Sequence, residues 1–72
     1  MLLDYRSKYT LTCIEKVRNN NDKILFYRMW DDSTGTVYEL KGSDIKDYVN
    51  RGVLTLTNLT IVILTLEIFF KN

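Results

Sequence analysis

The first half of the chain alternates apolar and polar residues, which predicts three β-strands. Over residues 8–18 the apolar side chains share one parity and most polar ones the other, as in a strand with one buried face. Residues 23–31 and 36–40 predict the second and third strands. The connecting segments 19–22 and 32–35 contain Asn, Asp and Gly, which tolerate left-handed backbone, so both are predicted turns.

A short helix is expected next. Ser43 is a suitable N-cap, and Asp44 follows it in the first turn, where the helix dipole favours negative charge. The apolar residues recur at helical spacing: Ile45, Tyr48 and Val49. Gly52 then fits the position after the C-cap. At about two turns, this helix depends on packing rather than on propensity.

Residues 53–70 are almost wholly apolar or β-branched, a composition that favours sheet. One straight strand of this length would extend roughly 60 Å at ~3.3 Å per residue. A compact domain of this size is only about 30 Å across. Asn58 accepts unusual backbone angles more readily than its neighbours, so we expect the chain to break there. The prediction is a fourth strand over 53–57 and a fifth over 59–69.

Together these elements predict one α+β domain over residues 1–72: a small antiparallel sheet with one short helix, in the order β-β-β-α-β-β. The first seven residues are expected to be disordered or loosely attached. The alternative is a small β-barrel of OB-like or SH3-like type, since an OB-like barrel also places its helix between the third and fourth strands. The chain has only three glycines, and the scarcity favours the open sheet.

Charge and composition exclude several functions. Ten Lys+Arg against nine Asp+Glu give a net charge of +1, too little to attract nucleic acid or a membrane surface. One cysteine and no histidine leave no intrachain disulfide, ordinary zinc site or Ser-His-Asp arrangement. We therefore expect no catalytic residue, metal or cofactor. The lone thiol, together with an amino terminus unlike a signal peptide, indicates a cytoplasmic protein.

A few residues still carry chemistry that needs a structural explanation. Cys13 has the parity of the apolar face of its strand, which favours a small buried side chain over a nucleophile. The pairs Asp31–Asp32 and Asp44 with Asp47 could bind a cation, but their spacing matches no calcium loop. Turn solvation and the helix dipole explain them more simply.

Two surfaces remain for binding. If Tyr27 and its same-parity neighbours face the core, then Phe26, Arg28 and Trp30 lie on the opposite face of the second strand and form a predicted partner-binding site. The alternative is that the chain's own helix or fifth strand covers them.

The predicted fifth strand has apolar residues of both parities. If its even-numbered residues fill the core, a second apolar row is left over: Leu59, Ile61, Ile63 and Phe69. One chain of 72 residues can hardly cover that row. An uncovered apolar row invites association, so we predict a homodimer interface there, with two-fold symmetry as the default.

Two stretches of the chain resemble a known kind of domain. Residues 23–35, KILFYRMWDDSTG, resemble the K-I-x-x-Y-R-x-x-D-x-x-G hairpin of small uncharacterised domains from Firmicutes and their phages or mobile elements. Residues 50–60, NRGVLTLTNLT, resemble the segment that leaves the helix in those domains. The resemblance covers roughly residues 8–61 and implies the fold, but it brings no activity and no site residue.

The leading functional hypothesis is therefore a non-enzymatic protein-binding module, encoded by a phage or mobile element, that inhibits a host protein of a defence system by occluding its surface. One alternative is an OB-like binder of single-stranded nucleic acid, in which aromatic residues stack on bases. The neutral net charge makes nucleic acid the weaker choice. The other alternative is a small-ligand sponge with its site at a dimer seam.

Overall fold

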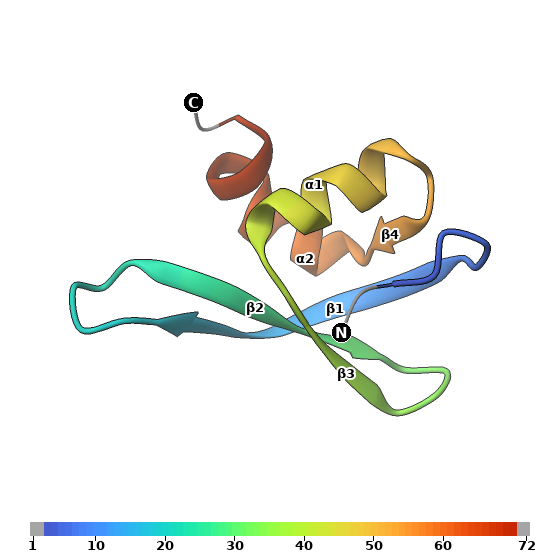
Figure 1. The fold of residues 1–72 in the computed structure, drawn as a ribbon, viewed down its shortest axis with the longest axis horizontal. Coiled ribbons are helices and arrows are strands. Elements are labelled where there is room, and N and C mark those ends of the chain that lie inside the picture. The colour runs from blue at the N-terminus through green and yellow to red at the C-terminus, as the bar shows by residue number, and fades with distance from the viewer. Residues whose placement is uncertain (1–2, 71–72) are drawn as a thin grey trace.

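A four-stranded sheet forms the base of the structure, and all the helices lie on one of its faces (Figure 1). The computed structural model describes residues 3–70. The strands are β1 (Tyr9–Arg18), β2 (Ile24–Asp31), β3 (Thr36–Leu40) and β4 (Leu54–Leu56), in the spatial order β3-β2-β1-β4. The sequence prediction of a small α+β domain is confirmed. The sheet is open rather than closed, so the barrel alternative is wrong.

The sheet is mixed rather than wholly antiparallel. β1 pairs antiparallel with β2, and β2 with β3, as the two predicted hairpins require. β4 instead pairs parallel with β1, Leu54 opposite Tyr9 and Leu56 opposite Leu11. This direction arises because the helix between β3 and β4 crosses one face of the sheet and returns the chain alongside β1.

The hairpin turns form at the predicted residues. Asp22 and Gly35 take positive φ angles of 63° and 73°, which Asp tolerates and glycine adopts without cost. In the first turn, Asn19 Oδ1 accepts hydrogen bonds from the backbone N–H groups of Asn21 (2.9 Å) and Lys23 (3.1 Å). The local sequence thus closes both hairpins.

A β-bulge changes the parity of β1. Cys13 lies opposite Met29 and Glu15 opposite Arg28, so Ile14 is an extra residue without a partner. Past the bulge Lys16 lies opposite the buried Tyr27. The sequence pattern had assigned Lys16 to the polar face of its strand. The bulge brings it to the helix side of the sheet, where it makes an ion pair.

Helix α1 (Gly42–Asn50) follows β3 and precedes β4 in the chain, and it covers one face of the sheet. Its N-cap is Lys41 rather than the expected Ser43, and no side chain caps it. Its C-terminal end is as predicted, with Gly52 at a φ of 75°. Buried Tyr48 also secures the amino-terminal segment, because its hydroxyl accepts a hydrogen bond from the N–H of Leu3 at 3.1 Å. Leu3 itself is buried, although it lies in the segment expected to be loose. Met1 and Leu2 lie outside the described residues.

The C-terminal segment is helical, so the predicted fifth strand is wrong and the element order is β-β-β-α-β-α. Helix α2 (Asn58–Leu64) begins at the predicted break and continues into a π-helical segment, η1 (Thr65–Phe69). Its buried residues are spaced four apart: Thr60, Leu64 and Ile68. That spacing puts one helical stripe against the core and overrides the sheet preference of the β-branched residues.

A threonine side chain takes over from β4 at the edge of β1. Beyond Leu11 the edge of β1 needs a hydrogen-bond acceptor, and the N–H of Cys13 donates to Thr60 Oγ1 at 2.9 Å. Thr60 Oγ1 also shares a hydrogen bond with Thr57 Oγ1, and Thr12 Oγ1 donates to Thr57 Oγ1. Thr60 of α2 thus satisfies a backbone group of β1 that a longer β4 would otherwise bind.

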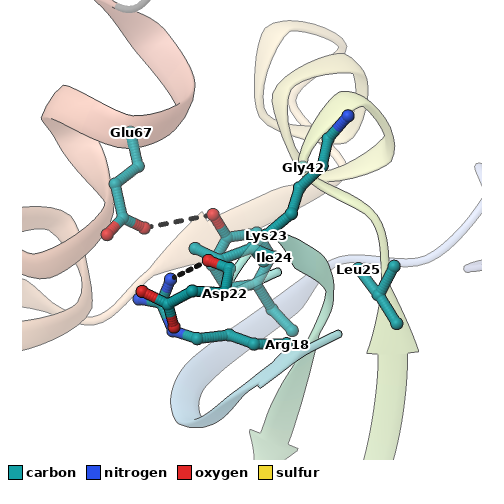
Figure 2. A pocket seen from close by; sticks show the side chains of 8 residues that line it. Arg18, Asp22, Lys23, Ile24, Leu25, Gly42 and Glu67 are labelled. Carbon is teal, nitrogen blue, oxygen red and sulfur yellow. Dashed lines mark hydrogen bonds and ion pairs between the residues drawn. The ribbon is translucent and has the colours of Figure 1, made fainter. Parts of the chain in front are cut away.

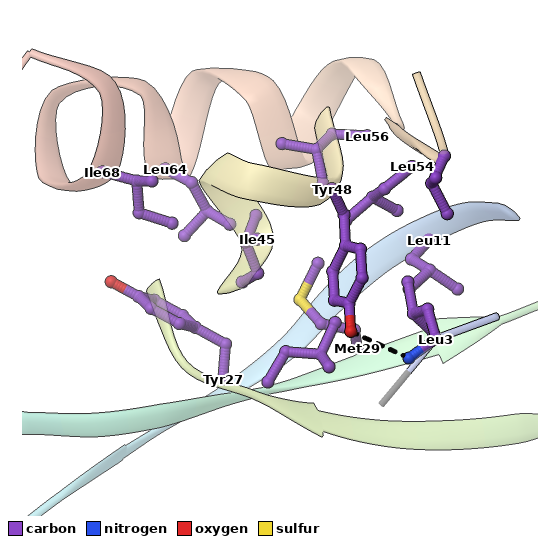
Figure 3. Packing of buried hydrophobic residues seen from close by; sticks show 12 residues of the cluster. Leu3, Leu11, Tyr27, Met29, Ile45, Tyr48, Leu54, Leu56, Leu64 and Ile68 are labelled. Atoms are coloured by element: carbon purple, nitrogen blue, oxygen red, sulfur yellow. Dashed lines mark hydrogen bonds between the residues drawn. The ribbon is translucent and has the colours of Figure 1, made fainter. Parts of the chain in front are cut away.

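The core lies between the sheet and the two helices (Figure 3). It contains buried side chains from every element: Leu3, Leu11, Tyr27, Met29, Leu40, Ile45, Tyr48, Val53, Leu54, Leu56, Leu64 and Ile68. Leu64 and Ile68 point down from the C-terminal helix toward Ile45 and Tyr27. The C-terminal helix is therefore an integral wall of the core.

Thr60→Val tests the role of the threonine at the sheet edge. The change keeps the shape but leaves the partly buried N–H of Cys13 without its acceptor, so the free energy of unfolding should fall by about 1–3 kcal/mol. The control is Thr10→Val, the same change at an exposed strand position, which should alter stability by no more than about 0.5 kcal/mol. Urea unfolding followed by circular dichroism measures both. Equal effects would contradict this role of Thr60.

Candidate protein-binding surface

The C-terminal helix is apolar around its whole circumference. One side is the buried stripe, and the opposite side is exposed to solvent. We call this second side the outer helix face; its residues are Leu59, Val62, Ile63, Leu66 and Phe70. Four of them are highly exposed, at 67%, 76%, 73% and 71% for Leu59, Val62, Leu66 and Phe70. Helices that are apolar on all sides are normally covered on all sides, so this face is the strongest candidate for a binding surface.

Only one charged residue lies between Asn58 and Phe70, and it points toward the sheet. Glu67 Oε1 lies 2.6 Å from Lys16 Nζ, and Tyr27 donates its hydroxyl to Glu67 Oε2 at 3.1 Å. The ion pair holds η1 against the bulged part of β1. The outer helix face is consequently left without any charge.

Lys16, Glu67 and Tyr27 form a cluster that we call the anchor. Within it, the Glu67 carboxyl group favours its charged form. Burial raises the pKa of Glu67, but the hydrogen bonds from Lys16 and Tyr27 lower it more, and the net pKa lies below its usual value. Burial, followed by the hydrogen bond to Glu67, raises the pKa of Tyr27 to about 12. Glu67 is therefore ionised and Tyr27 protonated at neutral pH, which keeps the anchor intact.

A polar pocket of about 370 Å³ opens beside this anchor (Figure 2). Its charged lining residues are Arg18, Lys23, Asp22 and Glu67. Arg18 Nε lies 3.7 Å from Asp22 Oδ1 and Glu67 is paired with Lys16. Because cations and carboxylates are balanced in this pocket, it offers no net charge to select an ionic ligand.

An apolar groove of about 530 Å³ runs along the other flank of the C-terminal helix. Ile61, Thr65, Phe69 and Phe70 form one wall, and residues of α1, β4 and the loop between them form the other: Val49, Gly52, Leu54, Thr55 and Leu56. Phe70 belongs to both the groove and the outer helix face. The two features thus form one continuous apolar surface.

The predicted partner-binding residues Phe26, Arg28 and Trp30 lie half-buried on β2, on the face of the sheet that carries no helix. Arg28 is already engaged, 3.1 Å from a Glu15 carboxylate oxygen and 3.3 Å from one of Glu39, with its guanidinium over the Phe26 ring. The structure does bring the three residues together and leaves the face free of helices. It also shows that the charge of Arg28 is paired with two carboxylates, while its buried Nε makes no hydrogen bond.

The predicted oligomer-interface residues differ in their exposure to solvent, because the segment is a helix and not a strand. Leu59, Ile61 and Ile63 are exposed, whereas Phe69 is partly buried and packs against the core. Strand parity missed Val62, Leu66 and Phe70, which it assigned to the interior. The spacing of Leu59, Val62 and Leu66, three and then four residues apart, was the sequence signal that could have revealed them.

The other chemistry-bearing residues serve the fold. Cys13 is half-buried, and burial raises the pKa of its thiol, which disfavours the reactive thiolate. Asp31 accepts hydrogen bonds from the backbone and hydroxyl of Ser33, which lowers its pKa. Asp47 pairs with Arg51 at 2.9 Å. In residues 3–70 no group of three or more His, Cys, Asp or Glu side chains could hold a metal ion.

Within residues 3–70, no helix is both long enough and apolar enough to cross a bilayer. No protein-family model, curated protein or solved structure matches the chain. The resemblance to small phage-associated domains therefore stays a prediction, and the functional argument depends on the surface itself.

The anchor predicts a specific pH dependence of stability. Because the folded-state pKa of Glu67 lies below its unfolded value near 4.5, its stabilising effect is full above pH 4.5 and is lost as the pH falls through the folded-state pKa. Glu67→Gln should therefore lower stability at pH 7 and flatten the decline in acid. Urea unfolding from pH 7 to pH 3 measures this, and parallel curves for the two proteins would refute it.

Proposed function

We propose that this protein is a non-enzymatic protein-binding module that docks another protein chain on its outer helix face. The observation that carries the proposal is the exposure of a helix that is apolar on all sides, with four side chains 67% to 76% accessible. Isolated exposed leucines are ordinary, but a contiguous apolar patch on a soluble domain marks an interaction site.

The spacing of the exposed residues suits a helix-mediated contact. Leu59, Val62, Ile63, Leu66 and Phe70 follow the i, i+3, i+4, i+7 pattern by which an amphipathic helix anchors in an apolar groove. Folding already holds this helix in place through its buried stripe and through Glu67. A partner would therefore meet a preformed surface and would not have to order it on binding.

The narrower expectation concerns the biological role. An inhibitor that occludes a cytoplasmic host protein, encoded by a phage or mobile element, needs a docking surface and no catalytic group. The described residues supply such a surface. The source and the host target are inferred from the sequence resemblance alone.

The two alternative functions find less support. Arg28 is the cation nearest the aromatic residues of the helix-free face, and two carboxylates already pair with it. A phosphate would have to displace them, which disfavours binding of single-stranded nucleic acid. A ligand sponge would need a closed site, whereas the apolar groove is open along the surface unless a second molecule covers it.

Photo-cross-linking in bacterial cells that express the chain tests the docking surface directly. A photoreactive phenylalanine at position 62 should form a covalent adduct with another polypeptide, because Val62 is the most exposed residue of the outer helix face. The matched control places the same residue at Val37, an exposed position on edge strand β3, and should give little adduct. Absence of any protein adduct at position 62 would refute the proposal.

Fluorescence anisotropy tests the nucleic-acid alternative. We expect no binding of labelled single-stranded DNA or RNA at micromolar protein and low salt, where phosphate contacts are strongest. Binding that weakens steeply with salt would favour the alternative and count against a protein-binding role.

A further inference from the structure

We propose that the chain covering the outer helix face is a second copy of this protein, in a two-fold dimer whose C-terminal helices pack antiparallel. This inference rests on the proposed function and specifies the partner. It follows from the charge, the shape and the area of the surface formed by the outer helix face and the apolar groove.

The charge pattern favours a like partner. A dissimilar protein is usually selected by complementary charges around the contact. Here the only charge of residues 58–70, Glu67, is paired with Lys16 on the other side of the helix. An interface without charges, dominated by Leu, Ile, Val and Phe, is typical of permanent homodimers, whose contacts resemble a divided core.

The shape is self-complementary. Leu59, Val62 and Leu66 form a ridge along the helix, and the groove follows the adjacent flank beside Ile61 and Phe69. A two-fold axis that turns one helix antiparallel to the other directs the ridge of each copy to the groove of its partner. Ridge and groove on one element are the requirement for an isologous contact, in which each copy uses the same patch.

The area also fits. Burying the exposed parts of the outer-face side chains, at on the order of 100 Å² each, covers roughly 500 Å² per copy, and the groove walls supply more. A standard stable interface needs about 800 Å² per partner. The separate chain exposes 5111 Å², whereas a monomer of 8.5 kDa is expected to expose roughly 4,650 Å². The difference, roughly 460 Å², is close to the area of the outer-face side chains.

Light scattering coupled to size exclusion measures the assembly. The wild type at about 100 μM should have twice the 8.5 kDa mass of the chain. Val62→Lys should give monomers and raise the dissociation constant on the order of 100-fold or more, because it buries an unpaired charge at the contact. Val37→Lys, the matched control, adds the same charge at an exposed edge-strand position where Lys is well tolerated, and should stay dimeric.

Leu66→Lys serves as a second interface variant. Val62→Lys and Leu66→Lys each place a good helix former at an exposed helical position, so both should fold. Circular dichroism checks the folding of each variant. A monomeric wild type, or dimeric Val62→Lys and Leu66→Lys, would overturn the dimer. If the wild type is monomeric and position 62 cross-links to a different protein, the proposed function stands and only the second copy is rejected. If it is monomeric and cross-links to nothing, both fail.

Discussion

The hydrogen bond from the N–H of Cys13 to Thr60 Oγ1 joins the edge of β1 to the C-terminal helix. At that point the edge of β1 has just lost β4 as its partner, and a side chain takes over from the backbone. A side-chain acceptor leaves the backbone of residues 58–64 free to make helical hydrogen bonds of its own. The C-terminal segment can then fold as a helix across the sheet rather than as a fifth strand beside it.

The helical form changes which apolar residues of this segment the protein can bury. In a fifth strand, two apolar rows would have faced two sides of a sheet. As a helix, the segment can bury only one stripe, and it directs Val62, Leu66 and Phe70 to solvent. The Lys16–Glu67–Tyr27 cluster removes the last charge from the outer side. The same contacts that stabilise the helix therefore create the proposed binding surface.

The two sides of the sheet have different characters. The helix-free side contains Phe26, Arg28 and Trp30, but its cation is matched by Glu15 and Glu39, as on the solvated face of an ordinary antiparallel sheet. The helix side ends in an uncharged apolar surface. A domain this small has few ways to gain stability besides covering such a surface with another subunit, so the proposed function would also stabilise the fold.

Local signals in the sequence determined most of the strands, turns and helix between Tyr9 and Leu56. Period-two patterns located β1, β2 and β3, and Asp22, Gly35 and Gly52 marked backbone turns that few residue types accept. The helix α1 and the break at Asn58 followed in the same way. These features depend on neighbours in the chain, so the chain alone encodes them.

The bulge at Ile14, the parallel pairing of β4 and the helical form of residues 58–69 do not follow from neighbouring residues in the chain. Taken one at a time, β-branched residues prefer strands. The buried stripe of Thr60, Leu64 and Ile68 forms only because it packs against a sheet and a helix built from residues far away in the sequence. Tertiary packing therefore decided the outer helix face, because it selected which side of an all-apolar segment the protein could bury.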